Sequence, residues 1–526
     1  MFENYRPQRV RRVEIPKDDG SGRMRPLGIP TISDRLIQQC ILQVLEPICE
    51  AKFSDNSYGF RPNRSCENAI SKAMMCMQRK HLHFCVDIDI KGFFDNVNHA
   101  KLLKQMWTLG LQDKNLLCII SKILNSEIIM PNGEIVKSEK GCPQGGLISP
   151  ILSNIVLNEL DWWINNQWSN KDLKEITPKI RESGARDRGG EYSRMRRYTK
   201  LKEMHIVRYA DDFKIFTNDY KTAKKIFEAV KLWLKDRLDL EISPEKSKIT
   251  NLKKNYTVFL GFKLKVFKKG NKQVVKSHIS DKAKKKIVKD ILRQVKITQH
   301  SKNLNKDLWL LNSKIIGYHN YYQIATVCSK DFREIAFFVS RAIRHRLKPK
   351  RTGTAKGYIN EKYGKSKQIR FIGSTALVPI SFIQHKNPMD KKKIINNYTI
   401  EGRAEIHKNL NGINIIVLHY LMENMSNENV EIYNNKIALY SGQNGKCFIT
   451  GKPLEIGKIH CHHKTPRHIK IDNSYGNLAL VSSDVHILIH AIKPETIKYY
   501  IDIINPDKKQ ISKINKLRKL LGIPCL

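Results

Sequence analysis

The strongest constraint on the fold of this chain is a β-rich run, residues 84–95, that ends in acidic residues. Strand alternation places Val86 and Ile88 on one face of the run. Asp87 and Asp89 then lie on the opposite face, and Asp89, at the end of the strand, can point into a cleft. We therefore expect a sheet with a carboxylate at its edge.

A second run, His205–Phe216, predicts two apolar strands joined by a short turn that contains Asp211 and Asp212. Adjacent aspartates in a turn are usually turn formers, because their side chains cap the local backbone. In a chain with 94 Lys+Arg against 50 Asp+Glu, a net charge of +44, carboxylates gathered by two strands instead indicate bound Mg²⁺. Two such ions about 3.5–4 Å apart would activate a primer 3′-hydroxyl and stabilise a pyrophosphate leaving group, which is polymerase chemistry.

The charge also predicts the partner. Cations are spread along all 526 residues and not gathered on one amphipathic helix, which favours nucleic acid over a membrane surface. A hydrophobic fraction of 41% is ordinary for a globular protein and argues against a disordered basic tail. No run approaches about 18 apolar residues, and the first residues lack the apolar core of a secretion signal. A soluble, unsecreted protein is expected.

The cysteines indicate a reducing compartment. There are 11, an odd number, and no C-x-x-C pair occurs, which argues against a disulfide scaffold. Most are expected to be buried thiols. The sequence leaves open whether the compartment is a bacterial cytoplasm or an organelle stroma or matrix, and it leaves the oligomeric state open as well.

Patterning divides the chain into a mixed α/β half and a basic helical part. Helical patterns alternate with β-rich runs up to about residue 265, and the apolar periodicity fades into a charged surface insertion over 177–202. Long basic helices follow over 277–347, in which Tyr318, Tyr321 and Tyr322 are expected to pack in the core, with base stacking as the alternative. A last unit contains a dense histidine cluster.

Six short blocks occur in a fixed order, and together they resemble the reverse transcriptases of the group II intron maturase family. Any one of them could arise by chance, but the ordered set is highly specific. The resemblance covers nearly the whole chain. The blocks are Arg25–Pro30, Tyr58–Ser65, Asp89–Asp95, Gly141–Gly146, Tyr209–Asp212 and Leu260–Phe262.

The resemblance implies the roles of the acidic residues. Asp89, Asp211 and Asp212 match the family's carboxylates that hold two Mg²⁺ ions, and the Ile90 carbonyl matches an additional metal contact. Phe94 matches the bulky residue that stacks under the sugar and rejects a 2′-hydroxyl, which selects dNTPs over rNTPs. A plain core aromatic is the alternative for Phe94.

The resemblance also implies a nucleotide pocket. Gln144 resembles the residue that contacts the incoming nucleotide. Arg25, Arg35 and Arg61 are candidates for holding the triphosphate, since a guanidinium can grip phosphate oxygens in a bidentate fork. In so basic a chain, an arginine is more often a solvated surface group, which is the alternative for all three.

Primer contacts follow from the same comparison. Leu260, Gly261 and Phe262 match the primer grip, and Lys246 precedes it as a candidate proton donor to pyrophosphate. The segment Leu311–Tyr322 is similar to the thumb, or maturase, region, where the implied task is binding of the parent intron RNA. That binding should weaken steeply with salt.

Four histidines in the last unit are arranged for metal chemistry. His486 and His490, at i and i+4, share one helical face, and His462 from a preceding strand can complete a site for one divalent ion. His463 points the other way on that strand and is free to act as the general base on a water that attacks phosphate. A purely structural zinc site is the alternative.

This histidine order, with Asn477 between its parts, resembles the ββα-metal HNH nuclease family. There the asparagine positions a loop and the single ion is Mg²⁺, Mn²⁺ or Zn²⁺. Two features depart from related units. Lys470-Ile471 stands where a Gly-Gly turn is common, and Thr450 and Val485 stand where cysteines would be, so no separate zinc knuckle is expected.

Together the resemblances imply an α/β (α+β) fold class: a right-hand polymerase with fingers and palm, a helical thumb and a small ββα-metal HNH domain. The expected domains are 1–265 for fingers and palm, 266–395 for the thumb or maturase domain, 396–445 for a linker or DNA-binding region, 446–500 for the endonuclease and 501–526 for a C-terminal tail. Only some twenty residues precede the first block, so a truncated product or a short family member is expected.

The implied function is threefold: RNA-directed DNA polymerase, intron splicing maturase and metal-dependent DNA endonuclease, acting in intron retrohoming. The partners would be group II intron RNA, target DNA and dNTPs. The competing hypothesis is an RNA-binding splicing cofactor whose polymerase or nuclease centre is inactive. The sequence does not identify the intron or the DNA target.

Overall fold

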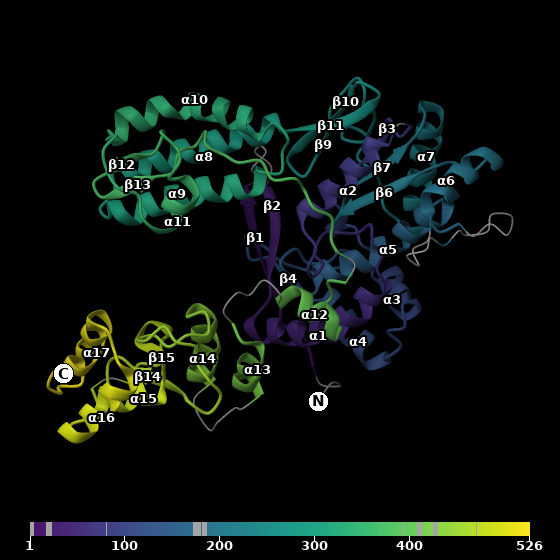
Figure 1. Cartoon of the computed structure of the whole chain (residues 1–526). Coiled ribbons are helices and arrows are strands. Elements are labelled where there is room, and N and C mark those ends of the chain that lie inside the picture. The colour runs from purple at the N-terminus through teal and green to yellow at the C-terminus, as the bar shows by residue number, and fades with distance from the viewer. Residues whose placement is uncertain are drawn as a thin grey trace. The chain divides into compact units, whose positions relative to one another are not determined.

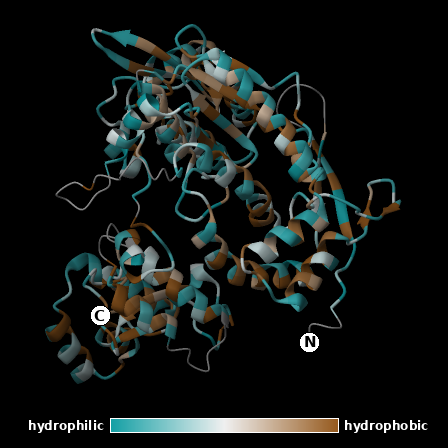
Figure 2. Cartoon of the chain, turned by 90° about the vertical axis from the view of Figure 1, so that its right-hand side faces the viewer, coloured by the Kyte–Doolittle hydropathy of each residue, from teal (hydrophilic) through white to brown (hydrophobic). Residues whose placement is uncertain are grey.

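The chain folds into two compact units, Met1–Lys392 and Lys393–Leu526 (Figure 1). The computed structural model describes residues 5–16, 24–79, 81–171, 180, 187–392, 394–407, 413–423, 430–469 and 471–526. Among the helices described there, none is both long and apolar enough to cross a membrane. Figure 2 shows apolar and polar residues interspersed along the helices of both units, as expected for helices that bury one face.

A four-stranded antiparallel sheet lies at the centre of the first unit. Its inner strand β3 contributes Val86 and Ile88 to the core, while Asp87 is half-buried on the other face, as the alternation predicts. The order of the strands is β6 (His205–Tyr209), β7 (Asp212–Thr217), β3 (Phe84–Ile88) and β8 (Lys248–Asn251).

Helices cover this sheet, and short polar side chains set where they begin. The Thr31 hydroxyl accepts the amide hydrogen of Asp34 at the start of α1, and Ser65 and Asn68 form a capping box at the start of α2. The helices are α1 (Ile32–Lys52), α2 (Cys66–Gln78), α3 (His99–Thr108), α4 (Lys114–Leu124), α5 (Ser149–Gln167), α6 (Arg188–Tyr198) and α7 (Tyr220–Trp233). A second sheet has the order β2 (Met24–Ile29), β1 (Val10–Pro16), β4 (Ile128–Ile129) and β5 (Ile135–Val136).

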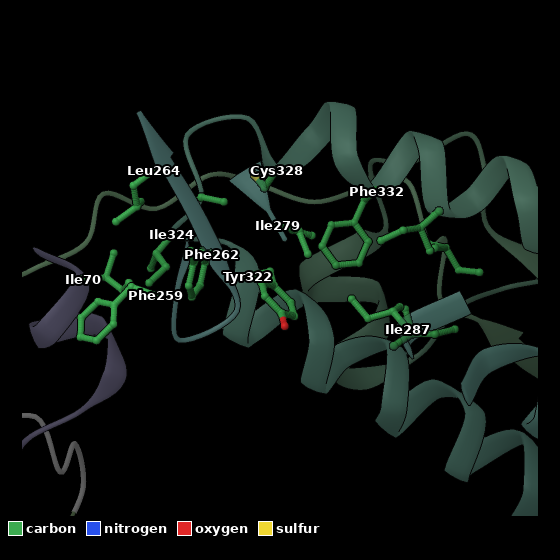
Figure 3. Close-up of a cluster of buried hydrophobic side chains, with 14 of the residues drawn as sticks. Ile70, Phe259, Phe262, Leu264, Ile279, Ile287, Tyr322, Ile324, Cys328 and Phe332 are labelled. Atoms are coloured by element: carbon green, nitrogen blue, oxygen red, sulfur yellow. The ribbon is translucent and has the colours of Figure 1, made fainter. Parts of the chain in front are cut away.

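A three-stranded sheet connects the central sheet and its helices to a helical bundle. One apolar core extends from Ile70 in α2 through Phe259 and Phe262 to Ile287 and Phe332 in the bundle (Figure 3). Because α2 and the bundle share this core, the bundle is packed onto the part of the chain that contains α2 and is not merely linked to it. The elements are β9 (Thr257–Phe259), β10 (Phe262–Lys269), β11 (Lys272–Ile279), α8 (Asp281–Gln299), α9 (Leu304–Tyr322), α10 (Cys328–Leu347), α11 (Gly357–Tyr363), β12 (Arg370–Ile372) and β13 (Thr375–Leu377).

The predicted charged insertion contains a helix. Residues 177–179 and 181–186 of that segment lie outside the described part, but 188–198 form α6. Met195 is buried, and the buried carboxylate of Glu203 accepts hydrogen bonds from Arg196 and lies 2.9 Å from Nε2 of His81. The segment thus contains a helix that the fading periodicity did not predict, and most of the residues of this helix remain exposed or half-buried at the surface.

The second unit is built around a β-hairpin and helices. Its core joins Leu439 of α14, Leu480 of β15, Val485 of α15 and Leu517 of α17. Residues 508–520, expected to lie in a tail, thus form a packed helix. The elements are α12 (Ile400–His407), α13 (Ile415–Glu423), α14 (Val430–Gly442), β14 (Ile459–His463), β15 (Leu478–Ser482), α15 (Ser483–His490), α16 (Pro494–Ile504) and α17 (Lys508–Leu520).

A buried histidine in the bundle predicts acid sensitivity. His319 donates from Nε2 to the Ile380 carbonyl at 2.9 Å and accepts from the Tyr363 hydroxyl at 3.0 Å on Nδ1. Burial lowers the pKa of His319 to about 4. The unfolded chain binds more protons between that value and about 6.5, so stability is lost as the pH falls through this window.

Between pH 7 and pH 5, the free energy of unfolding measured with urea should fall by about 2 kcal/mol more in wild type than in His319→Gln. The glutamine can keep the two hydrogen bonds but does not titrate. Equal losses in the two proteins would contradict the neutral, buried state of this imidazole.

Candidate active sites

The register of the central sheet brings the predicted aspartates to one edge. β3 and β7 are antiparallel and end with Ile88 opposite Phe213, so the next pair in this register is Asp89 and Asp212. The β6–β7 hairpin holds Asp211 in the turn beside them. Three carboxylates far apart in the sequence thus lie at the same end of the sheet.

These carboxylates affect one another's charge. Burial, which outweighs the opposing charge of Lys214 and is helped by the charges of Asp87, Asp211 and Asp89, raises the pKa of Asp212 to about 6. Burial likewise raises the pKa of Asp211, with Asp89 contributing. Crowded, half-desolvated carboxylates of this kind fit a divalent cation, which would supply the missing positive charge.

The three side chains are not gathered as tightly as metal ligands. They are absent from the groups of three or more His, Cys, Asp or Glu side chains, within the described residues, whose ligand atoms lie close enough to hold one ion. Asp89 instead pairs through Oδ2 with Nζ of Lys246 at 3.2 Å. This contact places Lys246 beside the predicted metal site, and a metal ion would have to replace it.

A buried ion pair supports the acidic turn. Arg208 and Asp161 are both 1% exposed or less, and two guanidinium nitrogens donate to the carboxylate at 2.7–3.0 Å. Nη1 of Arg208 also donates to the Ala210 carbonyl at 2.8 Å, and Ala210 has a positive φ of 58°. A Cβ on Gly59 would lie 2.2 Å from the Ala210 amide nitrogen, so only glycine allows this approach. Sequence reasoning missed these supports.

The two residues that are predicted to contact the incoming nucleotide, Phe94 and Gln144, line the same cavity. Phe94 and Gln144 line a cleft of about 930 Å³, open to solvent, together with Arg12, which sequence analysis did not select. The Gln144 carbonyl accepts the Gly28 amide hydrogen at 2.6 Å, and the Phe94 carbonyl accepts that of Cys142 at 2.7 Å. The half-buried Phe94 therefore borders a space and is not a plain core aromatic.

The three candidate arginines differ. Arg25 is exposed on β2, and its charge acts on Asp211, so it lies near the acidic edge. Arg35 is exposed in the first turn of α1. Arg61 is buried: it pairs with both carboxylate oxygens of Glu50 at 2.7 and 2.9 Å and donates Nη1 to backbone carbonyls. The triphosphate prediction for Arg61 was therefore wrong, because its guanidinium is already satisfied inside the protein.

The predicted primer-grip residues form a tight turn anchored to the bundle. Leu260 and Gly261 both have positive φ, 49° and 81°, between β9 and β10. The Tyr321 hydroxyl donates to the Leu260 carbonyl at 3.0 Å, and its ring stacks on Phe262 with centroids 5.6 Å apart. Tyr322 is buried against the same phenylalanine, as the prediction of core packing requires. Tyr321 is 39% exposed.

The histidines of the second unit form a compact cluster. Possible ligand nitrogens of His462, His486 and His490 all lie within 4.8 Å of one another. Nε2 of His462 is buried and has no hydrogen-bond partner in the described part of the chain. Burial and then the neighbouring histidines lower the pKa of His462 to about 3, which keeps this imidazole neutral, as a metal ligand must be. An orphaned nitrogen facing two imidazoles fits a divalent ion.

His463 is the last residue of β14, and Asn477 lies directly before β15. His463 follows His462 on β14, so its side chain lies on the other face of the strand; its Nε2 lies 3.1 Å from Oδ1 of Asn473 and 3.3 Å from Nε of Arg467. Asn477 accepts the Thr465 amide hydrogen at 2.9 Å and donates to the Asp472 carbonyl at 2.9 Å, which ties down the loop between β14 and β15. The Lys470 position lies outside the described residues.

Comparison with known proteins identifies the class. A family model described as reverse transcriptase (RNA-dependent DNA polymerase) matches residues 15–264. Protein YkfC of Escherichia coli is 32% identical over 289 residues, covering 53% of this chain and 74% of that protein. The chain therefore belongs to the reverse transcriptase family.

Within that family, the chain is similar to intron-encoded proteins. The group II intron-encoded protein LtrA of Lactococcus lactis is 35% identical over 297 residues, which cover 51% of this chain and 48% of LtrA. A putative COX1/OXI3 intron 2 protein of Saccharomyces cerevisiae is 30% identical over 282 residues, covering 49% of this chain and 32% of that protein. The chain thus spans about half the length of LtrA and less of the yeast protein.

The support of the acidic turn gives a prediction. Asp161→Ala would leave the Arg208 charge buried without its partner, which costs about 3–5 kcal/mol of unfolding free energy. Glu159→Ala, two residues away on α5, breaks a partly exposed pair with Arg237 and a hydrogen bond from Nε2 of Gln105, and it should cost only about 1 kcal/mol. Urea unfolding measures both. A similar small loss for the two variants would show that the buried pair does not support the turn.

Proposed function

We propose that this protein is an RNA-directed DNA polymerase that also acts as the splicing maturase of a group II intron. Membership of the reverse transcriptase family and similarity to intron-encoded proteins support this function. The single observation that carries it is the sheet register that brings Asp89 and Asp212 together beside the Asp211 turn. The cleft lined by Phe94 and Gln144 would then receive the incoming nucleotide.

Each residue has a defined task in this proposal. Asp89, Asp211 and Asp212, with the Ile90 carbonyl, would hold two Mg²⁺ ions. When bound, the ions lower the pKa of the primer 3′-hydroxyl and stabilise the leaving pyrophosphate. Lys246, once released from Asp89, can offer a proton to that pyrophosphate. The exposed Arg25 and Arg35 would hold the triphosphate.

The charge of the chain supports nucleic-acid partners. A net charge of +44 suits a protein that binds phosphate backbones. The primer terminus would rest on the backbone of Leu260, Gly261 and Phe262, which the bundle keeps in place through Tyr321. The basic helices of the bundle would bind the intron RNA, in the manner proposed for a maturase.

Asp211→Asn should abolish primer extension on an RNA template with Mg²⁺, because an amide cannot supply the charge that holds the ion. Asp239→Asn is the matched control: Asp239 is exposed with a positive φ of 59°, which asparagine tolerates. Incorporation of dNTPs by both variants would contradict the polymerase assignment. Wild type that bound intron RNA without extending a primer would favour an RNA-binding splicing cofactor instead.

Phe94→Ala should relax sugar discrimination, since the ring would no longer block the space of a 2′-hydroxyl. The ratio of kcat/KM for dCTP over CTP should fall at least tenfold, while Phe94→Tyr should keep it. Discrimination that is unchanged in the alanine variant would remove the gate role of this ring.

We further propose that the second unit is an HNH-type DNA endonuclease that nicks target DNA during retrohoming. The observation that favours it is the cluster of His462, His486 and His490 at a β-hairpin followed by a helix. His463 would deprotonate the attacking water, and Asn477 would position the loop. The single ion, Mg²⁺, Mn²⁺ or Zn²⁺, would stabilise the leaving oxygen.

His463→Ala should abolish strand nicking of target DNA and leave primer extension intact, because the base lies in a different compact unit from the polymerase aspartates. His468→Ala, an exposed histidine of the same loop, should nick like wild type. Loss of both activities in His463→Ala would show that the functions are not divided between the units. Full nicking by that variant would leave a structural metal site as the role of the cluster.

A further inference from the structure

A buried cation lies against the end of the helix that carries two of the clustered histidines. Arg518, in α17, is 1% exposed. Nη1 of Arg518 donates to the carbonyls of Leu488 and Ala491, both at 2.8 Å, with a longer contact of 3.4 Å to Ile489. Its Nε donates to the Pro524 carbonyl at 2.7 Å. In the described part of the chain, the hydrogen-bond acceptors of this guanidinium are backbone carbonyls and not carboxylates.

The position of this cation has a physical reason. The last carbonyls of a helix have no partner within it, and they form the negative end of the helix dipole. Leu488 and Ala491 contribute such carbonyls at the C-terminal end of α15, whose residues are Ser483–His490. The helix has only 8 residues, far below the roughly 12–15 at which a helix persists by itself, so its geometry depends on outside contacts.

His490 is the last residue of α15, and His486 lies one turn before it. Both imidazoles face His462 of the neighbouring strand, with ring centroids 5.6 and 5.3 Å from it. Leu488 lies two residues before His490, and Ala491 follows it directly. A shift of the Leu488 and Ala491 carbonyls would therefore move the ligand nitrogen of His490. A planar guanidinium that spans carbonyls on two segments holds such a turn more rigidly than a single ammonium can.

We propose that Arg518 is a positioning residue for the metal ion of the nuclease centre, which it serves by fixing the C-terminal turn of α15. The inference rests on the proposed endonuclease function and extends it, because the HNH pattern ends at His490 and does not include α17. The nuclease unit then continues beyond residue 500 to the C-terminal segment, where Asn515 in turn accepts the Leu526 amide hydrogen at 2.7 Å.

Two effects of this arginine on metal binding have opposite signs. By orienting the imidazoles, it should strengthen binding of the ion. By placing a positive charge near His490, it should weaken binding through repulsion. Variants that separate charge from geometry therefore test the proposal. Arg518→Lys keeps the positive charge but loses the planar guanidinium, while Arg518→Met loses both.

The experiment is a Co²⁺ titration of the full-length protein, followed by visible d–d absorption and by Zn²⁺ competition. Wild type should bind one Co²⁺ at the cluster, and His462→Ala should lose it. Arg518→Lys should bind Co²⁺ at least tenfold more weakly and with an altered spectrum. Lys519→Met, which changes the exposed neighbouring cation on α17, should match wild type.

The outcomes separate the proposal from its alternatives. Wild-type affinity in Arg518→Lys, or tighter binding in Arg518→Met, would overturn the positioning role. An arginine that only stabilised the fold would lower the unfolding midpoint but leave Co²⁺ affinity unchanged well below that midpoint, which would also overturn it. If Arg518→Met does not fold, Arg518→Gln replaces it and should bind at least tenfold more weakly. No Co²⁺ binding by wild type would instead contradict the proposed metal site itself.

Discussion

The antiparallel register between β3 and β7 is the constraint on which the proposed polymerase site depends. With Ile88 opposite Phe213, the pairing makes Asp89 the neighbour of Asp212. A slip of one residue would turn Asp89 toward the apolar side of the sheet, because side chains alternate between faces. The register is held by burial of Val86 and Ile88 beneath the sheet. Core packing on one face thus determines where the acidic groups lie on the other.

The acidic turn and the turn at Leu260 and Gly261 are both held by side chains from other parts of the chain. Arg208, paired with Asp161, holds the acidic turn through the Ala210 carbonyl. The hydroxyl and ring of Tyr321, in the helical bundle, hold the turn at Leu260 and Gly261. Positive φ angles at Ala210 and Leu260 are tolerated because these contacts determine them. The second unit repeats the principle, since a distant guanidinium caps the helix that presents two imidazoles.

Local patterns could be predicted from the sequence, and long-range partners could not. The period of two at residues 84–88, the acidic hairpin and the i, i+4 spacing of His486 and His490 each follow from one short segment. Whether an arginine faces solvent depends on residues elsewhere in the chain, so Arg61 was misassigned and Arg208 overlooked. The α6 helix was missed because few apolar residues mark it. Arg518 gave no signal, since its partners are backbone carbonyls.

The central claim is that Asp89, Asp211 and Asp212 jointly hold divalent ions. Replacement of Mg²⁺ by Fe²⁺, with ascorbate and peroxide, cuts a polypeptide close to the bound metal, and mass spectrometry locates the cuts. The account predicts cuts next to residue 89 and next to residues 210–212 in the same molecules, suppressed by excess Mg²⁺. Cuts confined to the histidine cluster, or cuts near these aspartates that Mg²⁺ does not suppress, would contradict it.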